Sequence, residues 1–362
     1  MKIGVCGHFG KGKNLANGQT IKTKIVTETL RHLYGSKNIY IVDSHGGAIH
    51  IPRIFTESFG MFRKCENIVM MLNMKGLLIC SPVYYFYRFL FQRNVHFVVI
   101  GGWLPVFLKK HAVTKYLLSH FDGIYVETDT MKQALDTMGF TNVLVMPNFK
   151  NINVVSAEEA SVLQYPPYKL CTFSRVMKEK GIEEAVQSVM EANGKLGYPA
   201  FELDIYGQID SGYADQFEDL KKKFPEYIRY GGVIQFDACT DILKNYFALL
   251  FPTYYEGEGF AGTLIDAMSA GVPVVATDWK YNKEIVRDGI TGKVLQKYPV
   301  DSTAQLIRQL TEQLISMAEK TEMWIRMRVS SRNEAEKYSP NEVIKVLTDR
   351  FDLTGGEEDE RK

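Results

Sequence analysis

The stretch Phe251–Asp278, FPTYYEGEGFAGTLIDAMSAGVPVVATD, decides the fold of the chain around it. An apolar run, Ala248–Pro252, predicts the end of a buried strand, and the β-branched run Val272–Thr277 predicts the next strand. Between them a glycine-rich loop leads into a helix expected over Thr263–Ala270, which Gly271 ends. The stretch is therefore a strand, a glycine-rich loop and a helix N-terminus.

Two acidic residues flank the turn into this helix. Glu258 lies at the mouth of the loop, and Asp266 lies one turn into the helix. Glycines let a ligand approach the backbone, and the N–H groups and dipole of a helix N-terminus favour an anion such as a diphosphate. An acid at each place could hold hydroxyl groups on two parts of one ligand. A structural alternative stays open, because Thr263 and Asp266 are spaced like a capping box and acids are common in a first helical turn.

The order of residues from Glu258 to Ala276 is more specific than either acid. It closely resembles the acid-x7-acid signature of the family-4 (group 1) retaining glycosyltransferases, which have the GT-B fold. The resemblance implies that Glu258 contacts a donor sugar, that Asp266 binds the nucleotide ribose, and that the loop between them receives the diphosphate. The residues of that loop are Gly259, Phe260, Ala261, Gly262 and Thr263. The chain departs from the usual pattern where Asp266 replaces Glu and Ala261 replaces a common Gly.

Composition and charge point to two domains with different surroundings. The 362 residues suffice for two domains, each with its own core. Five cysteines without a CxxC pair favour a reducing compartment over disulfides or zinc. We expect no signal peptide, and no apolar run approaches the roughly 18 residues that span a bilayer. Residues 1–150 hold 18 Lys and Arg against 8 Asp and Glu, whereas the remainder holds 25 against 34. This asymmetry indicates that one half meets a polyanion or an anionic surface.

Strands alternate with helical patterns over residues 1–150. This alternation predicts a parallel, doubly wound sheet, whose ligands bind outside the carboxyl ends of the strands. The strands that we expect are Lys2–Gly7, Asn38–Ser44, Gly76–Pro82, His96–Gly102, Gly123–Glu127 and Asn142–Asn148.

The loop GHFGKGKN at residues 7–14 closely matches the P-loop sequence pattern. Lys13 has the right spacing from the first glycine, but Asn14 stands where Ser or Thr should hold magnesium. A strand that ends in Asp43 could pass as a Walker B segment, so an NTPase stays open as an alternative. The glycosyltransferase resemblance implies instead that Gly18 lies near the donor phosphates.

Residues 83–121 are rich in aromatic and basic side chains. Val83–Arg93 reads VYYFYRFLFQR, and Pro105–Phe121 sets lysines among apolar residues after a proline at a helix start. One interpretation is core helices with a solvated face. The other is helices that lie on an anionic membrane, with aromatic side chains in the interface and lysines over lipid headgroups. The basic first half slightly favours the membrane.

His8, His111 and Trp103 are the candidates for the acceptor side of a site. Each histidine lies beside an expected loop or helix start, although a lone histidine is more often structural. The glycosyltransferase family often has a histidine-led motif after the fourth strand. Here that position reads Gly-Gly-Trp103, which departs from the family's pattern.

A cationic pair follows the first expected strand of the second domain, Leu170–Phe173. Arg175 and Lys180 would both lie near the carboxyl edge of that strand. Such a pair suits a pyrophosphate, because a guanidinium holds two oxygens and an ammonium supplies a point charge. The alternative is that these are ordinary surface side chains in water, as lysines often are. The pattern strand-Arg-x4-Lys-Gly-helix, however, closely matches the family's diphosphate-binding pair.

The patterns predict a two-domain chain of the GT-B type, an α/β fold with two Rossmann-like doubly wound domains that face each other across a cleft. Further strands are expected at Phe201–Gly207 and Gly231–Phe236, and two amphipathic helices from Asp301 to about Lys337. The expected limits are an acceptor-side domain at 1–150, a linker at 151–167, a nucleotide-sugar-binding domain at 168–338, a helix at 339–354 that crosses back to the first domain, and a disordered tail at 355–362.

The resemblance implies a metal-independent, retaining hexosyltransferase that moves a sugar from a UDP- or GDP-sugar to a glycan or lipid-linked glycan, in cell-surface polysaccharide biosynthesis. Glu258, Arg175 and Lys180 would be its catalytic residues, and Glu258 would orient the sugar rather than act as a nucleophile. We expect no cofactor beyond the nucleotide sugar, no metal ion and no nucleic acid, and a cytoplasmic location at the inner face of the membrane. A GT-B nucleotide-sugar epimerase, a P-loop-like NTPase and a noncatalytic glycan-binding module remain alternatives.

Overall fold

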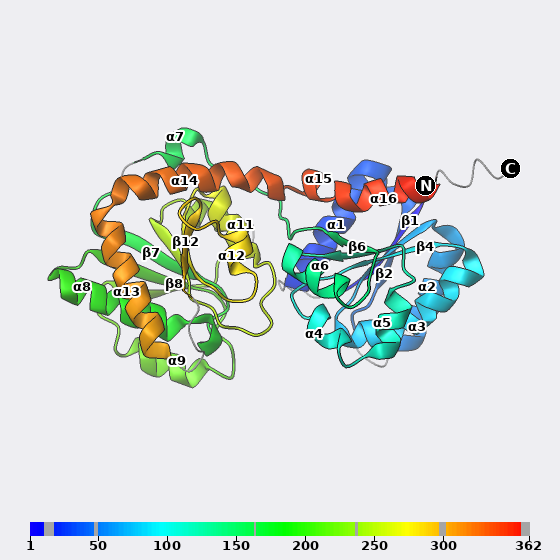
Figure 1. Cartoon of the computed structure of the whole chain (residues 1–362), viewed down its shortest axis with the longest axis horizontal. Helices are drawn as coiled ribbons and strands as arrows, with labels where there is room; N and C mark the ends of the chain where they lie inside the picture. Colours follow the sequence, from blue (N-terminus) through cyan, green and yellow to red (C-terminus); the bar gives the residue numbers. More distant parts are fainter. Residues whose placement is uncertain (11–17, 47–49, 163, 236–237, 297–301, 356–362) are drawn as a thin grey trace. The chain divides into compact units, whose positions relative to one another are not determined.

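The computed structural model describes residues 1–10, 18–46, 50–162, 164–235, 238–296 and 302–355. They form two compact units (Figure 1). The first unit holds Met1–Asn151 together with the segment that begins at Tyr338, and the second unit holds Ile152–Lys337. The first unit is therefore built from two separate stretches of sequence.

The first unit contains a six-stranded parallel sheet with the order β2-β1-β3-β4-β5-β6. Its central strands β1 and β3 are buried along their whole length, as expected for strands covered on both faces. This confirms the predicted doubly wound sheet. The strands are β1 (Ile3–Gly7), β2 (Ile39–Asp43), β3 (Asn67–Met71), β4 (Asn94–Val98), β5 (Gly123–Val126) and β6 (Val143–Val145).

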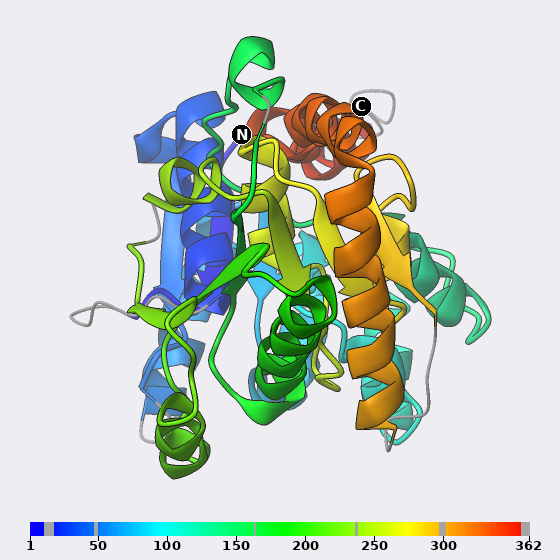
Figure 2. The same cartoon turned by 90° about the vertical axis from the view of Figure 1, so that its left-hand side faces the viewer.

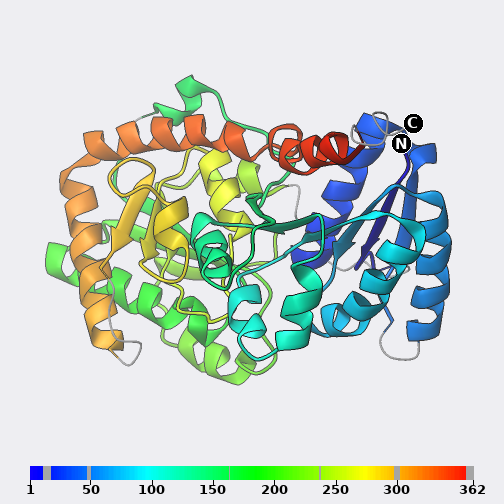
Figure 3. The same ribbon diagram turned by 45° about the vertical axis from the view of Figure 1, so that its right-hand side comes forward.

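The helices of the first unit form two layers around this sheet. In Figure 3, α1 and the C-terminal helices lie on one face of the sheet, and α2, α3 and α5 cover the other. The helices are α1 (Gly18–Tyr34), α2 (Ile51–Lys64), α3 (Met74–Phe91), α4 (Leu104–Leu108), α5 (Ala112–Leu118), α6 (Asp129–Asp136), α15 (Pro340–Val343) and α16 (Lys345–Gly355), with a 3-10 turn, η1 (Ser36–Asn38).

The prediction of a strand at Gly76–Pro82 is wrong, because these residues belong to α3. The strand in this part of the chain is β3, which the sequence pattern missed. Asn73 starts the helix, since its side chain accepts a hydrogen bond from the Gly76 amide at 2.9 Å. A short apolar run does not distinguish strand from helix by periodicity, so the polar cap was the better signal.

The second unit contains another six-stranded parallel sheet, with the order β12-β11-β10-β7-β8-β9. Two features of this sheet differ from the prediction. The strand expected at Gly231–Phe236 is β9 at Ile228–Gly232, because Gly232 takes a positive φ of 81° and ends it. The edge strand β12 was not predicted. The strands are β7 (Tyr168–Phe173), β8 (Phe201–Tyr206), β9 (Ile228–Gly232), β10 (Ala248–Phe251), β11 (Val274–Thr277) and β12 (Gly292–Leu295).

The helices of the second unit pack on a large apolar core. Figure 2 shows α8 and α13 side by side against this sheet, and their buried side chains join the core with Trp324 of α14. The elements are α7 (Ala157–Ala160), η3 (Lys178–Lys180), α8 (Ile182–Leu196), α9 (Ala214–Lys221), α10 (Cys239–Leu243), α11 (Gly262–Ser269), α12 (Asn282–Ile285), α13 (Thr303–Glu319), α14 (Thr321–Ala335) and η5 (Glu336–Tyr338).

The segment expected to be a linker, 151–167, packs mainly into the second unit from Ile152 onward. Val155 is buried and its amide donates to the Ser269 carbonyl at 2.9 Å, and Ser156 and Glu159 form a capping box at α7. The return to the first unit begins at Tyr338, whose carbonyl accepts from the Lys150 amide at 3.3 Å. Helices α15 and α16 then belong to the first unit.

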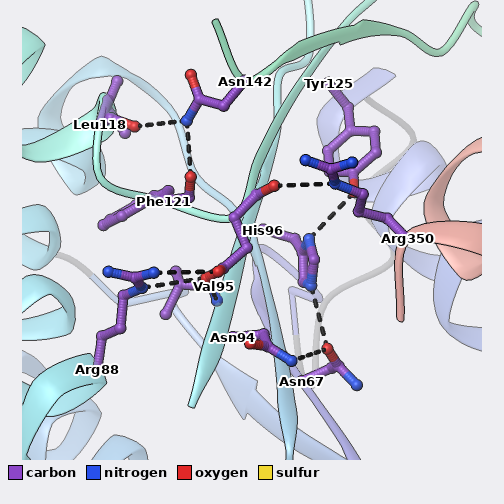
Figure 4. Close-up of polar contacts among 11 residues, drawn as sticks. Asn67, Arg88, Asn94, Val95, His96, Leu118, Phe121, Tyr125, Asn142 and Arg350 are labelled. Atoms are coloured by element: carbon purple, nitrogen blue, oxygen red, sulfur yellow. Dashed lines mark hydrogen bonds and ion pairs between the residues drawn. The ribbon is translucent and has the colours of Figure 1, made fainter. Parts of the chain in front are cut away.

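A buried histidine lies where α16 covers the amino ends of the first sheet (Figure 4). His96 Nε2 contacts Asn67 Oδ1 and its Nδ1 contacts the Tyr125 hydroxyl, both at 3.1 Å. The His96 and Phe351 ring centroids are 4.9 Å apart, and Arg350 donates to the Asp122 carbonyl. Burial lowers the pKa of His96 to about 4, so its imidazole is uncharged at neutral pH.

Candidate functional site

Glu258 is held by an ammonium group and a hydroxyl group. Lys180 Nζ lies 2.6 Å from Glu258 Oε2, and the Thr253 hydroxyl donates to the same oxygen at 2.8 Å. The Lys180 and Glu258 side chains are only 11% and 7% exposed. Each charge in such a pair offsets the other's loss of hydration. The structure thus brings together two of the three residues predicted to be catalytic.

A tight turn after β7 places Lys180 beside the end of β10. Gly181 ends the turn with a φ of 73°, and a Cβ at this position would lie 2.4 Å from the Pro252 carbonyl oxygen. The Tyr254 amide donates to the Glu179 carbonyl at 2.8 Å. Because the turn is fixed to the β10 loop by backbone contacts, only glycine fits after Lys180, which explains the Lys-Gly pair in the sequence.

Arg175, the third residue of the predicted catalytic set, has a different partner. Its Nη1 lies 3.7 Å from Asp210 Oδ2, and its side chain is 55% exposed. The Arg175 backbone is fixed more firmly than its side chain, because Gly207 passes against it with a φ of 138°. A Cβ on Gly207 would lie only 1.7 Å from the Ser174 carbonyl oxygen. An exposed ion pair of this length contributes little, so the Arg175 guanidinium is available to a stronger anion.

Helix α11 begins without a side-chain cap. Its N-cap residue is Ala261, and Thr263 is the second helical residue, so the capping-box interpretation of Thr263 and Asp266 is wrong. The Thr263 hydroxyl is buried and has no hydrogen-bond partner within the described part of the chain. Asp266 is 6% exposed. The first amides of α11 therefore point out of the helix without a capping side chain, as in anion-binding helix N-termini.

Two residues of this neighbourhood were not predicted from the sequence. Thr253 is fully buried, bonds to Glu258, and accepts from the Tyr255 amide at 3.2 Å. Glu184 lies in the first turn of α8, where burial raises the pKa of its carboxyl group. Its Oε1 accepts from the Tyr254 hydroxyl at 3.4 Å, and its Oε2 has no hydrogen-bond partner among the described residues. A polar residue directly after the apolar run of β10 was the available signal for Thr253.

His8 lies in a polar cluster at the carboxyl ends of β1 and β2 in the first unit. Its Nδ1 contacts the Thr20 hydroxyl at 2.8 Å, and its Nε2 contacts His45 Nδ1 at 2.9 Å. Burial, together with the neighbouring His45, lowers the pKa of His8. Asp43 joins this cluster because its carboxylate accepts from the Phe9 and His45 amides at 3.0 and 2.9 Å. The strand ends thus gather imidazole, hydroxyl and carboxylate groups, as a doubly wound sheet allows.

Trp103 and His111 form a second, aromatic cluster around α4. The His111 ring stacks on Phe107 at 3.9 Å and donates to the Phe107 carbonyl at 2.7 Å. Trp103 packs edge-on against the same Phe107, and its indole N–H donates to the Ile100 carbonyl at 2.9 Å. His111 thus links the start of α5 to α4, and Trp103 packs at the start of α4.

The P-loop-like segment is only partly described. Gly18 is exposed at the first residue of α1, and a Cβ there would meet nothing within 4 Å. Lys13 and Asn14 lie outside the described residues. The described residues contain no group of three or more His, Cys, Asp or Glu side chains placed to hold a metal ion. All five cysteines are buried and free.

The comparison with protein families decides the class of the second unit. The family model described as "Glycosyl transferases group 1" matches residues 167–313. Residues 167–313 form a group 1 glycosyl transferase domain. This domain contains Arg175, Lys180, Glu258 and the start of α11, whereas the candidates His8, Gly18, Trp103 and His111 lie outside it.

Curated relatives of this glycosyl transferase domain are longer than the chain. The GtfA subunit of a UDP-N-acetylglucosamine–peptide N-acetylglucosaminyltransferase from Streptococcus gordonii is 28% identical over 208 residues, 54% of this chain and 38% of that protein. The poly(glycerol-phosphate) alpha-glucosyltransferase of Bacillus subtilis is 26% identical over 287 residues, 68% of this chain and 41% of that protein. The chain thus spans about two fifths of these relatives.

Solved structures show the fold of the whole chain. Anabaena HepE in complex with UDP superposes with a TM-score of 0.73 at 14% identity, over 98% of this chain and 100% of that one. Pneumococcal GtfA in complex with UDP and GlcNAc gives a TM-score of 0.63 at 19% identity, over 82% of this chain and 58% of that one. The predicted GT-B fold, with two α/β units, is confirmed.

Proposed function

We propose that the chain is a glycosyltransferase that moves a sugar from a UDP-sugar to a hydroxyl group of a glycan acceptor. The observation that carries this proposal is the Lys180–Glu258 pair beside the uncapped start of α11, within a domain of the group 1 glycosyl transferase type. The choice of uridine rests on HepE and GtfA, whose structures contain UDP.

The chemistry requires stabilisation of a diphosphate as the bond to the sugar breaks. The Lys180 ammonium, the Arg175 guanidinium and the first amides of α11 supply positive charge and N–H donors to the leaving oxygens. Glu258, already oriented by Lys180 and Thr253, would position the donor sugar, and Asp266 would accept from the ribose hydroxyls. These groups act without a protein nucleophile.

Arg175→Ala tests the predicted diphosphate contact. We expect UDP to bind at least tenfold more weakly, whereas uridine, which lacks the phosphates, should bind unchanged. Isothermal titration calorimetry with both ligands measures the difference. Lys178→Ala is the matched control, because Lys178 is exposed in the same loop and should leave both affinities unchanged. Equal losses for UDP and uridine would contradict the assigned role.

We further propose that the transfer retains the anomeric configuration and needs no metal ion. With no nucleophile in the proposed set, the acceptor hydroxyl would attack on the face from which the diphosphate leaves. The two cationic side chains and the helix N-terminus take the place that a metal ion has in other diphosphate sites. Activity should survive EDTA, and NMR of the product should show the donor's anomeric configuration.

A panel of UDP-sugars with glycan and lipid-linked acceptors tests the proposed reaction directly. Transfer of sugar to an acceptor supports it. Release of an epimerised sugar without acceptor would instead identify an epimerase, and ATP hydrolysis would identify an NTPase. The names of two relatives specify a peptide and poly(glycerol-phosphate), which supports including both polymers in the acceptor panel.

We also propose that the first unit contacts an anionic membrane through residues 83–121. Phe86, Phe89 and Leu90 on α3 are 61%, 55% and 55% exposed, and Lys109 and Lys110 are exposed nearby in sequence. Apolar side chains beside lysines suit the interface of an anionic bilayer. No helix within the described ranges is long and apolar enough to cross a membrane.

Co-sedimentation with phosphatidylserine vesicles measures this contact. The double variant Phe86→Ala/Phe89→Ala should bind at least tenfold more weakly, since each phenyl ring contributes on the order of 1 kcal/mol at an interface. Leu33→Ala removes a similarly exposed apolar side chain, 50% exposed, from α1 and should bind normally. Equal binding by the double variant would exclude the proposed contact.

A further inference from the structure

A cavity lies in the second unit, at the amino ends of strands whose carboxyl ends lead to Lys180 and Glu258. Its volume is about 440 Å³, and its lining includes Lys169 near the amino end of β7 and Lys244 just before β10. Lys180 and Glu258 instead follow the carboxyl ends of the same two strands. Because the strands are parallel, the length of a strand separates the two places.

Arg328 of α14 forms the buried wall of this cavity. It is 2% exposed, and its Nε and Nη1 donate to the carbonyls of Ala160 and Tyr246 at 3.2 and 2.8 Å. Figure 1 shows α7, which ends at Ala160, lying along α14. No carboxylate within the described part of the chain forms an ion pair with this guanidinium. Burial lowers the pKa of Arg328 to about 10, and no neighbouring acid opposes that effect.

The rim of the cavity carries two further cations. Lys169 is exposed and pairs with no acid among the described residues. Lys244 lies 3.6 Å from both Glu159 and Asp241, in loose and exposed contacts. Of the residues that line the cavity, Lys169, Lys244 and Arg328 are cationic and Glu159 is acidic, so positive charge exceeds negative charge by two.

We propose that this cavity binds a small phosphomonoester, separately from the nucleotide site. Burial of a guanidinium without an acid partner costs folding free energy. The two carbonyls use only part of the N–H groups of Arg328, and the oxygens of a phosphate can accept hydrogen bonds from the remaining ones. A phosphomonoester carries close to two negative charges at pH 7, which matches the excess charge of the lining. The volume lies within the range of roughly 300–1,000 Å³ typical of small-molecule sites, so it admits a sugar-sized body as well as the phosphate. The inference does not depend on the proposed transferase activity.

Calorimetric titration with glucose 6-phosphate, inorganic phosphate and glucose tests the site in low salt. Glucose 6-phosphate should bind in a saturable manner, inorganic phosphate more weakly and glucose not at all. Lys169→Glu should weaken the binding of glucose 6-phosphate at least tenfold. Lys195→Glu, the same charge change at an exposed lysine near the end of α8, should leave it unchanged.

Two further variants distinguish this site from the nucleotide site. Arg175→Ala should bind glucose 6-phosphate normally, and saturating UDP should not displace it. Arg328→Lys keeps the positive charge but loses the paired N–H donors of the guanidinium, so this variant should bind glucose 6-phosphate more weakly. A thermal melt of the variant checks that it is folded. No saturable binding to the unaltered protein, unchanged binding by Lys169→Glu, or loss of binding in Arg175→Ala would each overturn the proposal.

Discussion

Replacing Lys180 with alanine should lower kcat/KM for the UDP-sugar by about 10²–10³-fold, the range seen when a group that stabilises developing charge is removed. The variant loses the ammonium expected at the leaving phosphate. It also leaves the Glu258 carboxylate buried without its ionic partner, since the two side chains are 2.6 Å apart. Initial rates of UDP release measure the loss.

Folding and catalysis are separable in this experiment. Removal of one partner of a buried pair costs roughly 3–5 kcal/mol of folding free energy, so Lys180→Ala should also melt earlier. The double variant Lys180→Met/Glu258→Gln contains no unpaired buried charge and should recover much of that stability, but not the activity. Lys178→Ala is the surface control. If Lys180→Ala kept its activity to within about threefold, the ammonium would have no part in the reaction.

Gly207→Ala should destabilise the second unit by roughly 2–5 kcal/mol, from overpacking together with backbone strain. Gly207 has a φ of 138°, and its Cβ would lie 1.7 Å from the Ser174 carbonyl oxygen. Neither backbone segment can move easily, because the Gly207 amide donates to Gly232 and the Ser174 amide donates to Tyr206. Urea unfolding at equilibrium measures the change in the free energy of unfolding.

Gly232→Ala separates the two causes of that loss. Gly232 also has a positive φ, 81°, but a Cβ there would meet nothing within 4 Å. This control should therefore lose only the conformational cost, about 1–2 kcal/mol. Similar losses for both glycines would show that the close approach to Ser174 has no energetic consequence.

The second unit was more predictable than the first because its signals are local. The β10 loop, the start of α11 and the Arg175-x4-Lys180-Gly pattern each lie within a few consecutive residues, and in the last of them Gly181 takes a positive φ that only glycine adopts readily. The contact between Lys180 and Glu258 joins residues 78 positions apart, which periodicity alone does not reveal. The family resemblance implied a role for each of the two residues, but their contact with each other was not predicted.

The first unit shows where local patterns fail. The apolar residues Gly76–Pro82 suited a strand as well as a helix, and the Asn73 cap decided between them. His111 was singled out for its place beside a helix start, and its stacking on Phe107 was not predicted. His45 and the buried Lys22–Glu127 pair, 2.7 Å apart, were missed because their partners come from distant strands and helices.

The division of the first unit between two stretches of sequence has a consequence for synthesis on the ribosome. Residues up to Asn151 emerge long before α15 and α16, so the nascent first sheet has no Phe351 packed over His96. Its imidazole is then less buried, so its pKa should rise from about 4 toward the ordinary value of about 6.5. The second unit can complete its folding once Lys337 has emerged from the ribosome. The part of the chain that is translated first is therefore the last to be completed.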